Sequence, residues 1–243
     1  MTRINYSDNI RAGGRTLYLQ TNNLEEERKI ISTLFESGRV LGKEERGYND
    51  NLTSEKLRDR IKKLHMDNVT TIELLYEISV GERAECDRAR LNQLGLGFMK
   101  WNLLEEAIGA FRRALQCDSH DRDSWFRLGV ANLQNKDYVT AMQAFRRALK
   151  IDPGNENIRF YVTLCLVEIL VNGVPNRTFS VDNDFINKVG RHLNRMAAIS
   201  SRFRKAELEK ALQEFNRGEY VETLTILRSI AHERQNPDFD KRR

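Results

Sequence analysis

The chain has 243 residues, of which 40% are hydrophobic and 31% are charged, and its formal net charge is +5. A chain of this length can bury a core as one elongated domain or as two small ones. The N-terminal residues contain no apolar signal-peptide core, and the longest apolar stretch, YVTLCLVEILV, is interrupted by Glu168. We therefore expect a cytoplasmic protein without membrane insertion.

The first predicted elements are short strands. The stretch TLYLQT, Thr16 to Thr21, alternates polar and apolar residues, which is typical of a half-buried strand. The stretch KIISTLFESGRVLGKEE, which starts at Lys29, predicts two further strands joined by a Ser-Gly turn. Together they predict a small antiparallel β meander, which needs a cover for its apolar face because two or three strands are not stable alone.

A helix from about Ser54 to Ile78 is the predicted cover of this meander. Its apolar residues recur at helical spacing and lie along one face, namely Leu57, Ile61, Leu64, Ile72 and Leu75. We therefore predict an N-terminal module of a β meander plus a helix over residues 1–80.

An internal repeat dominates the middle of the chain. The sequence AFRRAL occurs at Ala110 and again at Ala144, an offset of 34 residues. This offset aligns residues 88–121 with residues 122–155, and each copy has the pattern of two amphipathic helices joined by a tight turn. Small residues at matching positions allow paired helices to approach to about 8–10 Å. The second copy ends at Asp152-Pro153-Gly154, because proline cannot continue a helix and glycine accepts the turn.

The period and residue order resemble the tetratricopeptide repeat. Asn132 stands where this family favours tyrosine, and Ser119 replaces the proline of the first copy. The matching residues of the first copy are Leu91, Leu94, Gly95, Phe98, Ala107, Phe111 and Ala114, and those of the second are Trp125, Leu128, Gly129, Ala141, Phe145, Ala148 and Pro153. The resemblance implies a mainly α fold, a tetratricopeptide-repeat α-solenoid that follows the N-terminal β meander and helix. The N-terminal arrangement resembles modules that precede such repeats in bacterial proteins, and no function follows from that likeness.

Less regular helices follow the two clear repeats. The segment from Glu156 predicts a third helix A, and Asp184 to Ile199 predicts its irregular partner. A further pair, with Gly218 in its turn, predicts a degenerate terminal unit. The predicted repeat domain therefore spans residues 81–236, with degenerate units at 156–200 and 201–236, and residues 237–243 form a flexible tail.

The resemblance also implies a binding surface on the inner faces of the A helices. The predicted groove residues are Asn92, Leu96 and Met99 in the first unit, Phe126, Val130 and Leu133 in the second, and Phe160, Leu164 and Val167 in the third. This set is apolar, so it favours an amphipathic helix or a hydrophobic peptide as the ligand. Members of the family that bind a C-terminal carboxylate use Lys, Arg and Asn at these positions; only Asn92 fits that pattern. We expect an adaptor, scaffold or chaperone-like protein that binds another protein or peptide.

Several alternatives stay open at this stage, among them an enzymatic or ligand-binding role of the N-terminal β module, whose distinctive features are the pair Gly13-Gly14 and Tyr18. The chain could fill its own groove, with the Ser54 to Ile78 helix or with the C-terminal unit. Residues 88–155 carry 11 basic against 7 acidic residues, so a nucleic acid could bind there, although the interspersed carboxylates disfavour it. Its candidate phosphate contacts are Arg112, Arg113, Arg146 and Arg147. A homo-oligomer could form through the repeats or through the strand edges.

No catalytic, cofactor or metal site is predicted. The four histidines are scattered, and none stands in an HExxH motif or beside a candidate nucleophile. The three cysteines form no CxxC pair. The pair Cys117 and His120 has C-x-x-H spacing, but two ligands leave a tetrahedral site half complete. We therefore expect a protein that is not an enzyme.

Overall fold

The computed structural model describes residues 4–49, 52–81, 87–173, 182–199 and 202–235. The chain folds into two compact units, Met1–Asp118 and Ser119–Arg243. The domain limits predicted from the repeat pattern, at 80/81 and 236/237, stay predictions, and the predicted tail lies outside the described residues.

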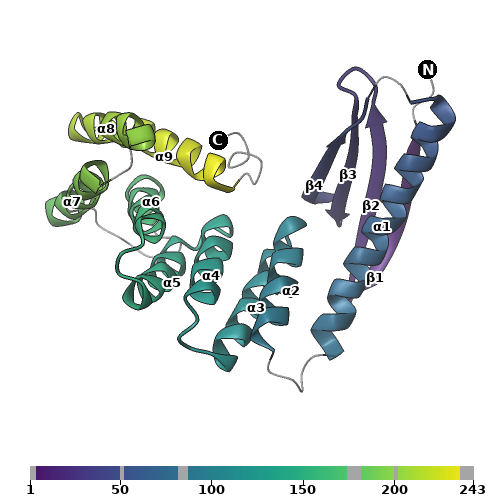
Figure 1. The fold of residues 1–243 in the computed structure, drawn as a ribbon, viewed down its shortest axis with the longest axis horizontal. Helices are drawn as coiled ribbons and strands as arrows, with labels where there is room; N and C mark the ends of the chain where they lie inside the picture. The colour runs from purple at the N-terminus through teal and green to yellow at the C-terminus, as the bar shows by residue number, and fades with distance from the viewer. Residues whose placement is uncertain (1–3, 50–51, 82–86, 174–181, 200–201, 236–243) are drawn as a thin grey trace. The chain divides into compact units, whose positions relative to one another are not determined.

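The first unit begins with a four-stranded antiparallel sheet in the order β1-β2-β3-β4 (Figure 1). Its strands are β1 (Asn5–Ala12), β2 (Arg15–Leu24), β3 (Lys29–Glu36) and β4 (Arg39–Gly47). The predicted meander is confirmed, and β1 is an addition to it. The turn between β1 and β2 uses Gly13 and Gly14, both with positive φ, a conformation that glycine adopts without steric cost.

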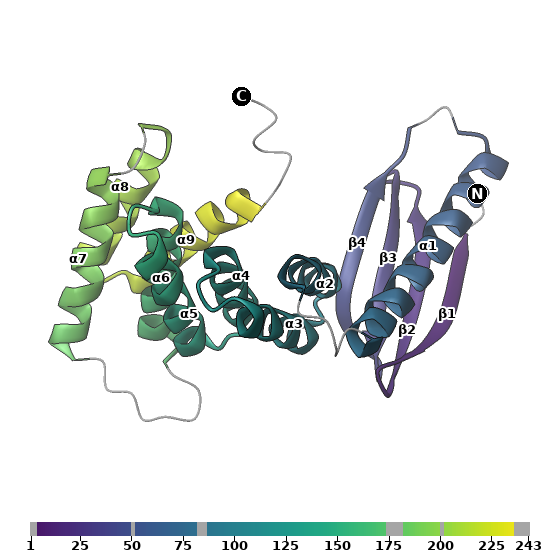
Figure 2. The same ribbon diagram turned by 60° about the horizontal axis from the view of Figure 1, so that its bottom comes forward.

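Helix α1 (Ser54–Gly81) lies across one face of the sheet, as Figures 1 and 2 show. Alternate strand residues point toward it, because successive side chains of a strand face opposite sides. Ile10, Leu17 and Leu34 on the strands are fully buried, as are Ile61 and Ile72 on the helix. The predicted cover is therefore confirmed, and the sheet shares its core with α1.

A buried polar chain connects the sheet to α1. One ring nitrogen of His65 lies 2.9 Å from the Thr21 hydroxyl, and the other lies 3.0 Å from a carboxylate oxygen of Asp8. The Thr21 hydroxyl lies 3.0 Å from that of Ser32, which accepts a hydrogen bond of 3.1 Å from the Asn68 amide. Asp8 is exposed, but His65, Thr21, Ser32 and Asn68 are buried. Because buried polar groups need hydrogen-bond partners, these contacts fix how α1 sits on the strands.

The helix pair α2 (Arg88–Lys100) and α3 (Leu104–Cys117) completes the first unit. The chain at the end of α2 approaches the sheet closely at Gly42, where an added Cβ would lie 2.5 Å from the carbonyl oxygen of Trp101. Nearby, the Asn102 amide donates a hydrogen bond of 2.7 Å to the Leu41 carbonyl. On the same unit, Arg15 pairs with both Glu36 and Glu106. The sheet and this helix pair therefore pack as one body within Met1–Asp118.

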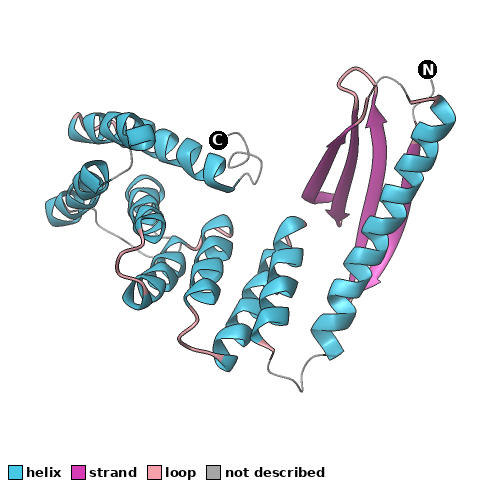
Figure 3. Ribbon diagram, in the orientation of Figure 1, coloured by secondary structure: helices cyan, strands magenta, loops and turns pink. Residues whose placement is uncertain are grey.

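The described elements of the second unit are all helices, joined by loops (Figure 3). Its helices are α4 (Arg122–Gln134), α5 (Tyr138–Ile151), α6 (Glu156–Asn172), α7 (Asn183–Ile199), α8 (Arg202–Asn216) and α9 (Tyr220–Gln235). Gly218, between α8 and α9, has a φ of 84°, as the predicted turn requires. Most of the predicted loop between α6 and α7 lies outside the described residues. The predicted class, a mainly α repeat fold with a small N-terminal β meander and helix, is confirmed.

Each clear repeat is built around one glycine and one phenylalanine. A Cβ added to Gly129 on α4 would lie 2.5 Å from Cε1 of Phe145 on α5. Gly95 on α2 and Phe111 on α3 are in the same relation, and both phenylalanine rings are fully buried. The absent side chain is therefore what allows the helices of each pair to pack together.

Candidate protein-binding surfaces of the repeats

The repeat period is visible in the caps of the A helices. Asp87, Asp121 and Asn155 stand 34 residues apart, and each accepts a hydrogen bond at the start of a helix, from the backbone N–H of Arg90, Ser124 and Ile158. Such caps satisfy one of the N–H groups that have no partner inside the helix. The caps define where α2, α4 and α6 begin, and they place the third helix A at Glu156, as the sequence predicted.

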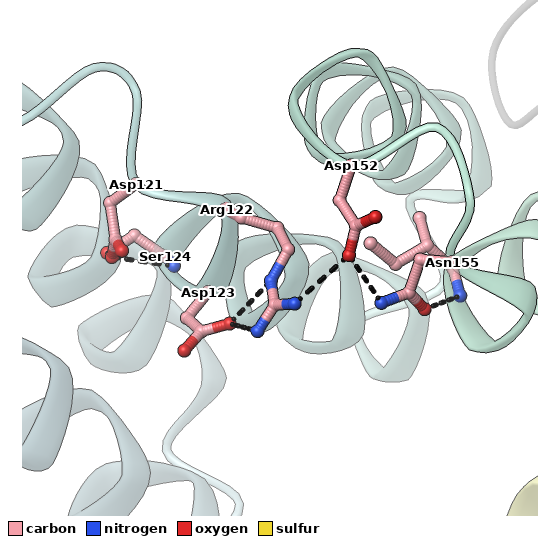
Figure 4. Close-up of polar contacts among 7 residues, drawn as sticks. Asp121, Arg122, Asp123, Ser124, Asp152 and Asn155 are labelled. Carbon is pink, nitrogen blue, oxygen red and sulfur yellow. Dashed lines mark hydrogen bonds and ion pairs between the residues drawn. The ribbon is translucent and has the colours of Figure 1, made fainter.

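An ion pair recurs with the same period. Arg88 and Asp118 lie 2.9 Å apart in the first unit, and Arg122 and Asp152 lie 3.1 Å apart in the second. Figure 4 shows the second pair: Arg122 bridges Asp123 and Asp152, and Asp152 accepts a further hydrogen bond of 2.9 Å from the Asn155 amide. The first residue of helix A is thus joined to the residue that follows helix B. The arginine and the aspartate recur at matching positions of the two aligned repeats, but the sequence analysis did not predict that they pair.

The predicted contact residues on α2 differ in exposure. Leu96 is 38% exposed, Met99 is half-buried, and Asn92 is buried with only 4% of its surface exposed. Leu91, Leu94 and Phe98 on the same helix are buried. Of the three predicted residues, Leu96 and Met99 therefore offer apolar surface, and Asn92 is a packing residue in this structure.

The predicted residues on α4 surround an aromatic cluster. Phe126 is half-buried, and its ring centroid lies 5.6 Å from that of Phe145 and 5.2 Å from that of Tyr161. Leu133 is half-buried, whereas Val130 is buried. Phe126 therefore has two roles, because part of its ring supports the contact between α4, α5 and α6 and part of it stays accessible.

The predicted residues on α6 are buried by their own chain. Phe160 and Leu164 are 1% and 2% exposed and Val167 is fully buried, and the burial extends over every residue from Phe160 to Ile169. A helix that is apolar on all sides needs neighbours on all sides, and α6 packs against α5, α7 and α9. In this conformation α6 offers no open apolar face.

A buried carboxylate joins α6 to α9. Glu168 is 5% exposed and receives two hydrogen bonds of 2.8 Å from the Arg228 guanidinium and one of 2.8 Å from the Asn172 amide. The pKa of nearby Tyr138 is raised, first by burial and then by the charge of Glu168. Burial likewise raises the pKa of the Cys165 thiol. The sequence did not reveal this ion pair, because its partners lie 60 residues apart.

The described residues also bear on metal binding, nucleic-acid binding and membrane crossing. Among them, no group of three or more His, Cys, Asp and Glu side chains could hold a metal ion. Cys117 is disulfide-bonded, which the cysteine spacing did not predict. The Arg113 guanidinium donates a hydrogen bond of 3.2 Å to the Ser79 carbonyl, so one of the four arginines considered for nucleic-acid binding has a structural role. Among the described helices, none has the length and apolar character that a membrane crossing requires.

Comparison with known proteins identifies the repeats. The family model of the tetratricopeptide repeat matches residues 76–156. The peroxisomal targeting signal receptor of Kluyveromyces lactis is 27% identical over 96 residues, which are 40% of this chain and 16% of the receptor. That of Yarrowia lipolytica is 38% identical over 52 residues, which are 21% of this chain and 9% of the receptor. The chain thus aligns with 16% or less of the length of these relatives.

Two crystal structures of MamA are also similar. One covers 75% of this chain and 97% of MamA at 14% identity, and the other covers 70% and 84% at 15% identity, each with a TM-score of 0.47. The family match and the repeated packing are sufficient for one conclusion: the chain contains tetratricopeptide repeats, in the helix pairs α2–α3 and α4–α5.

Proposed function

We propose that this protein is a non-catalytic protein-interaction module, which acts as an adaptor, a scaffold or a chaperone-like factor. The observation that carries the proposal is the tetratricopeptide-repeat match over residues 76–156, since stacked repeats generally serve to present extended surfaces to other proteins. The curated relatives are named as receptors for a targeting signal, which is consistent with recognition of a segment of another protein. From these relatives we infer only that the partner is a segment of another protein.

The ligand that fits best is an amphipathic helix or a hydrophobic peptide. Support comes from the accessible apolar residues on the A helices, Leu96 and Met99 on α2 and Phe126 and Leu133 on α4. Covering the exposed part of a leucine that is 38% exposed, such as Leu96, contributes about 1 kcal/mol. Anchors at i, i+3 and i+7 of a ligand helix would use such contacts. The buried residues Asn92, Val130, Phe160, Leu164 and Val167 are assigned to packing.

The proposal is tested with peptides selected from a random library against the purified full chain. Binding of a selected peptide is then measured by fluorescence anisotropy for the wild type and for Leu96→Glu and Leu133→Glu. Ile151→Glu is the matched control, because Ile151 is 39% exposed but lies at the end of α5, outside the A helices. Circular dichroism checks that each variant is folded.

We expect selected peptides with apolar residues at helical spacing. At least one of the A-helix variants should weaken their binding by about tenfold or more, because a charge would face an apolar contact. The control should change affinity by less than about threefold. Equal binding by all variants, or selection of peptides without apolar anchors, would contradict the proposal.

A further inference from the structure

Helix α7 has two contrasting faces. Val189, Leu193 and Met196 are buried, and they form the face that packs into the second unit. The exposed residues Lys188, Arg191 and Arg195 follow each other at steps of three and four, so they form a stripe along the other side of the helix. At 1.5 Å per residue the stripe is about 10 Å long.

This stripe borders a hollow in the surface of the second unit. The hollow has a volume of about 640 Å³, and the described residues that line it are Lys188, Arg191, His192, Asn194, Arg195 and Ala198. Three of these carry a permanent positive charge, the Asn194 amide adds hydrogen-bonding capacity, and no acidic side chain is among them. The hollow is therefore a basic site with polar groups.

Within the described part of the chain, the positive charges of the site have no carboxylate partner. Among the described residues, no carboxylate lies within 4.0 Å of Lys188, Arg191, Arg195 or the nearby Arg146 of α5, although Arg122, Arg217 and Arg228 of the same unit all make ion pairs. The pKa of His192 is lowered, first by burial and then by Arg146, Lys188, Arg195 and Arg191. These four cations therefore act together on one point, and an anion placed there would relieve their mutual repulsion.

We propose that the basic hollow of α7, formed by Lys188, Arg191, His192, Asn194 and Arg195, binds an acidic segment of a partner protein through its Asp and Glu side chains. Guanidinium groups suit carboxylates because they can donate two parallel hydrogen bonds. In an extended segment, alternate side chains point the same way about 7 Å apart, so two carboxylates on one side of it match a stripe about 10 Å long. This surface is separate from the apolar residues of α4, and the proposal goes beyond the function inferred from the repeats.

An acidic protein segment fits the hollow better than a nucleic acid. Single strands bind to proteins largely by stacking of bases on aromatic side chains, and no described residue that lines the hollow is a phenylalanine, tyrosine or tryptophan. A duplex is held by cations distributed along many phosphates, whereas the three cations that line the hollow lie within about 10 Å along one helix. The charge pattern is compact, as a short run of carboxylates requires.

The test uses a fluorescein-labelled hexaglutamate peptide and the full chain at low ionic strength. Its binding is measured by fluorescence anisotropy for the wild type and for Arg191→Glu/Arg195→Glu. The matched control is Arg58→Glu/Lys62→Glu, because these residues are also four apart, exposed on a helix, and the same in charge. Circular dichroism verifies the folding of both double variants. A labelled ten-residue thymidine oligonucleotide is measured in parallel.

We expect saturable binding of hexaglutamate that weakens by about tenfold or more in Arg191→Glu/Arg195→Glu and by less than about threefold in the control. Bound peptide should also raise the pKa of His192, followed by NMR of its ring protons, because carboxylates favour the protonated ring. The proposal is overturned if the wild type does not bind hexaglutamate, if both double variants lose the same affinity, or if the His192 resonance titrates identically with and without peptide. It is equally overturned if the oligonucleotide binds more tightly and depends on the same two arginines.

Discussion

The contact between Gly95 and Phe111 makes the packing of the first repeat directly testable. In Gly95→Ala, the new Cβ would lie 2.6 Å from Cζ and 2.8 Å from Cδ1 of the Phe111 ring, well inside ordinary van der Waals contact. The ring is fully buried, so it has no free space to move into. Overpacking of this kind costs about 1–3 kcal/mol of folding free energy.

The same unit contains a matched control. Gly109 lies in α3, is exposed, and has no atom within 4 Å of the position where a Cβ would be added. Replacing a glycine inside a helix by alanine stabilises it by about 0.5–1 kcal/mol, and this gain applies to both sites. We therefore expect Gly109→Ala to be more stable than the wild type by that amount, and Gly95→Ala to be less stable than Gly109→Ala by about 1–3 kcal/mol.

Urea denaturation followed by circular dichroism measures this difference. The midpoints of Gly95→Ala, wild type and Gly109→Ala should rise in that order with an unchanged slope, because an unchanged slope means that stability alone has changed. Gly129→Ala should behave like Gly95→Ala, since its Cβ would lie 2.5 Å from Phe145 Cε1. If Gly95→Ala matches or exceeds Gly109→Ala, the ring is free to move, and the packing argument is refuted.

Three further predictions concern the second unit. Glu168→Ala should lower the free energy of unfolding by about 1–3 kcal/mol in urea denaturation, because it removes three hydrogen bonds from a buried carboxylate; Arg228, which is half exposed, limits the loss by returning to water. Asp121→Ala should cost about 1 kcal/mol by the same assay, through loss of the α4 cap. His192 should titrate below its ordinary pKa in NMR, and Arg146→Gln should raise that pKa because one repelling charge is removed.

The sign of the His192 effect also determines how stability depends on pH. A histidine whose pKa is lower in the folded than in the unfolded state binds fewer protons when folded, so its contribution to stability is present above the unfolded pKa. That contribution falls as the pH decreases below the ordinary value of about 6.5. A His192→Gln variant should lose less stability than the wild type over this range. The electrostatic argument is contradicted if His192 titrates at its ordinary pKa, or if its pKa is the same in Arg146→Gln as in the wild type. The packing arguments are contradicted if Glu168→Ala or Asp121→Ala is as stable as the wild type.

Local sequence patterns were sufficient to predict those elements whose formation depends on residues a few positions apart. The repeated AFRRAL predicted the helix pairs, since alanine, glycine and phenylalanine at fixed spacing are what close helix packing requires. The start of α1 at Ser54 followed from its apolar face. By contrast, β1 was not predicted, because Asn5–Ala12 is mostly polar. This strand is held in the sheet by its pairing with β2 and by the contact between Asp8 and His65.

The proposed binding surfaces show the same division. The sequence placed nine residues on the inner faces of three A helices by their repeat position, and Leu96 and Met99 have the exposure that a contact residue needs. Periodicity could not indicate that α6 would be enclosed by α5, α7 and α9. Enclosure depends on how later helices return to α6, and contacts between residues 60 apart leave no periodic signal in the chain.

The sequence by itself determined the class of fold, the two clear repeats, and the helical faces, because these depend on periodicity and on residues that lie close together along the chain. Only the tertiary structure decided which apolar residues stay accessible, that Glu168 meets Arg228, and that Arg146 joins the cations of α7 around His192. Burial and electrostatic fields are sums over neighbours from several elements. The spatial arrangement of those neighbours therefore exists only once the chain has folded.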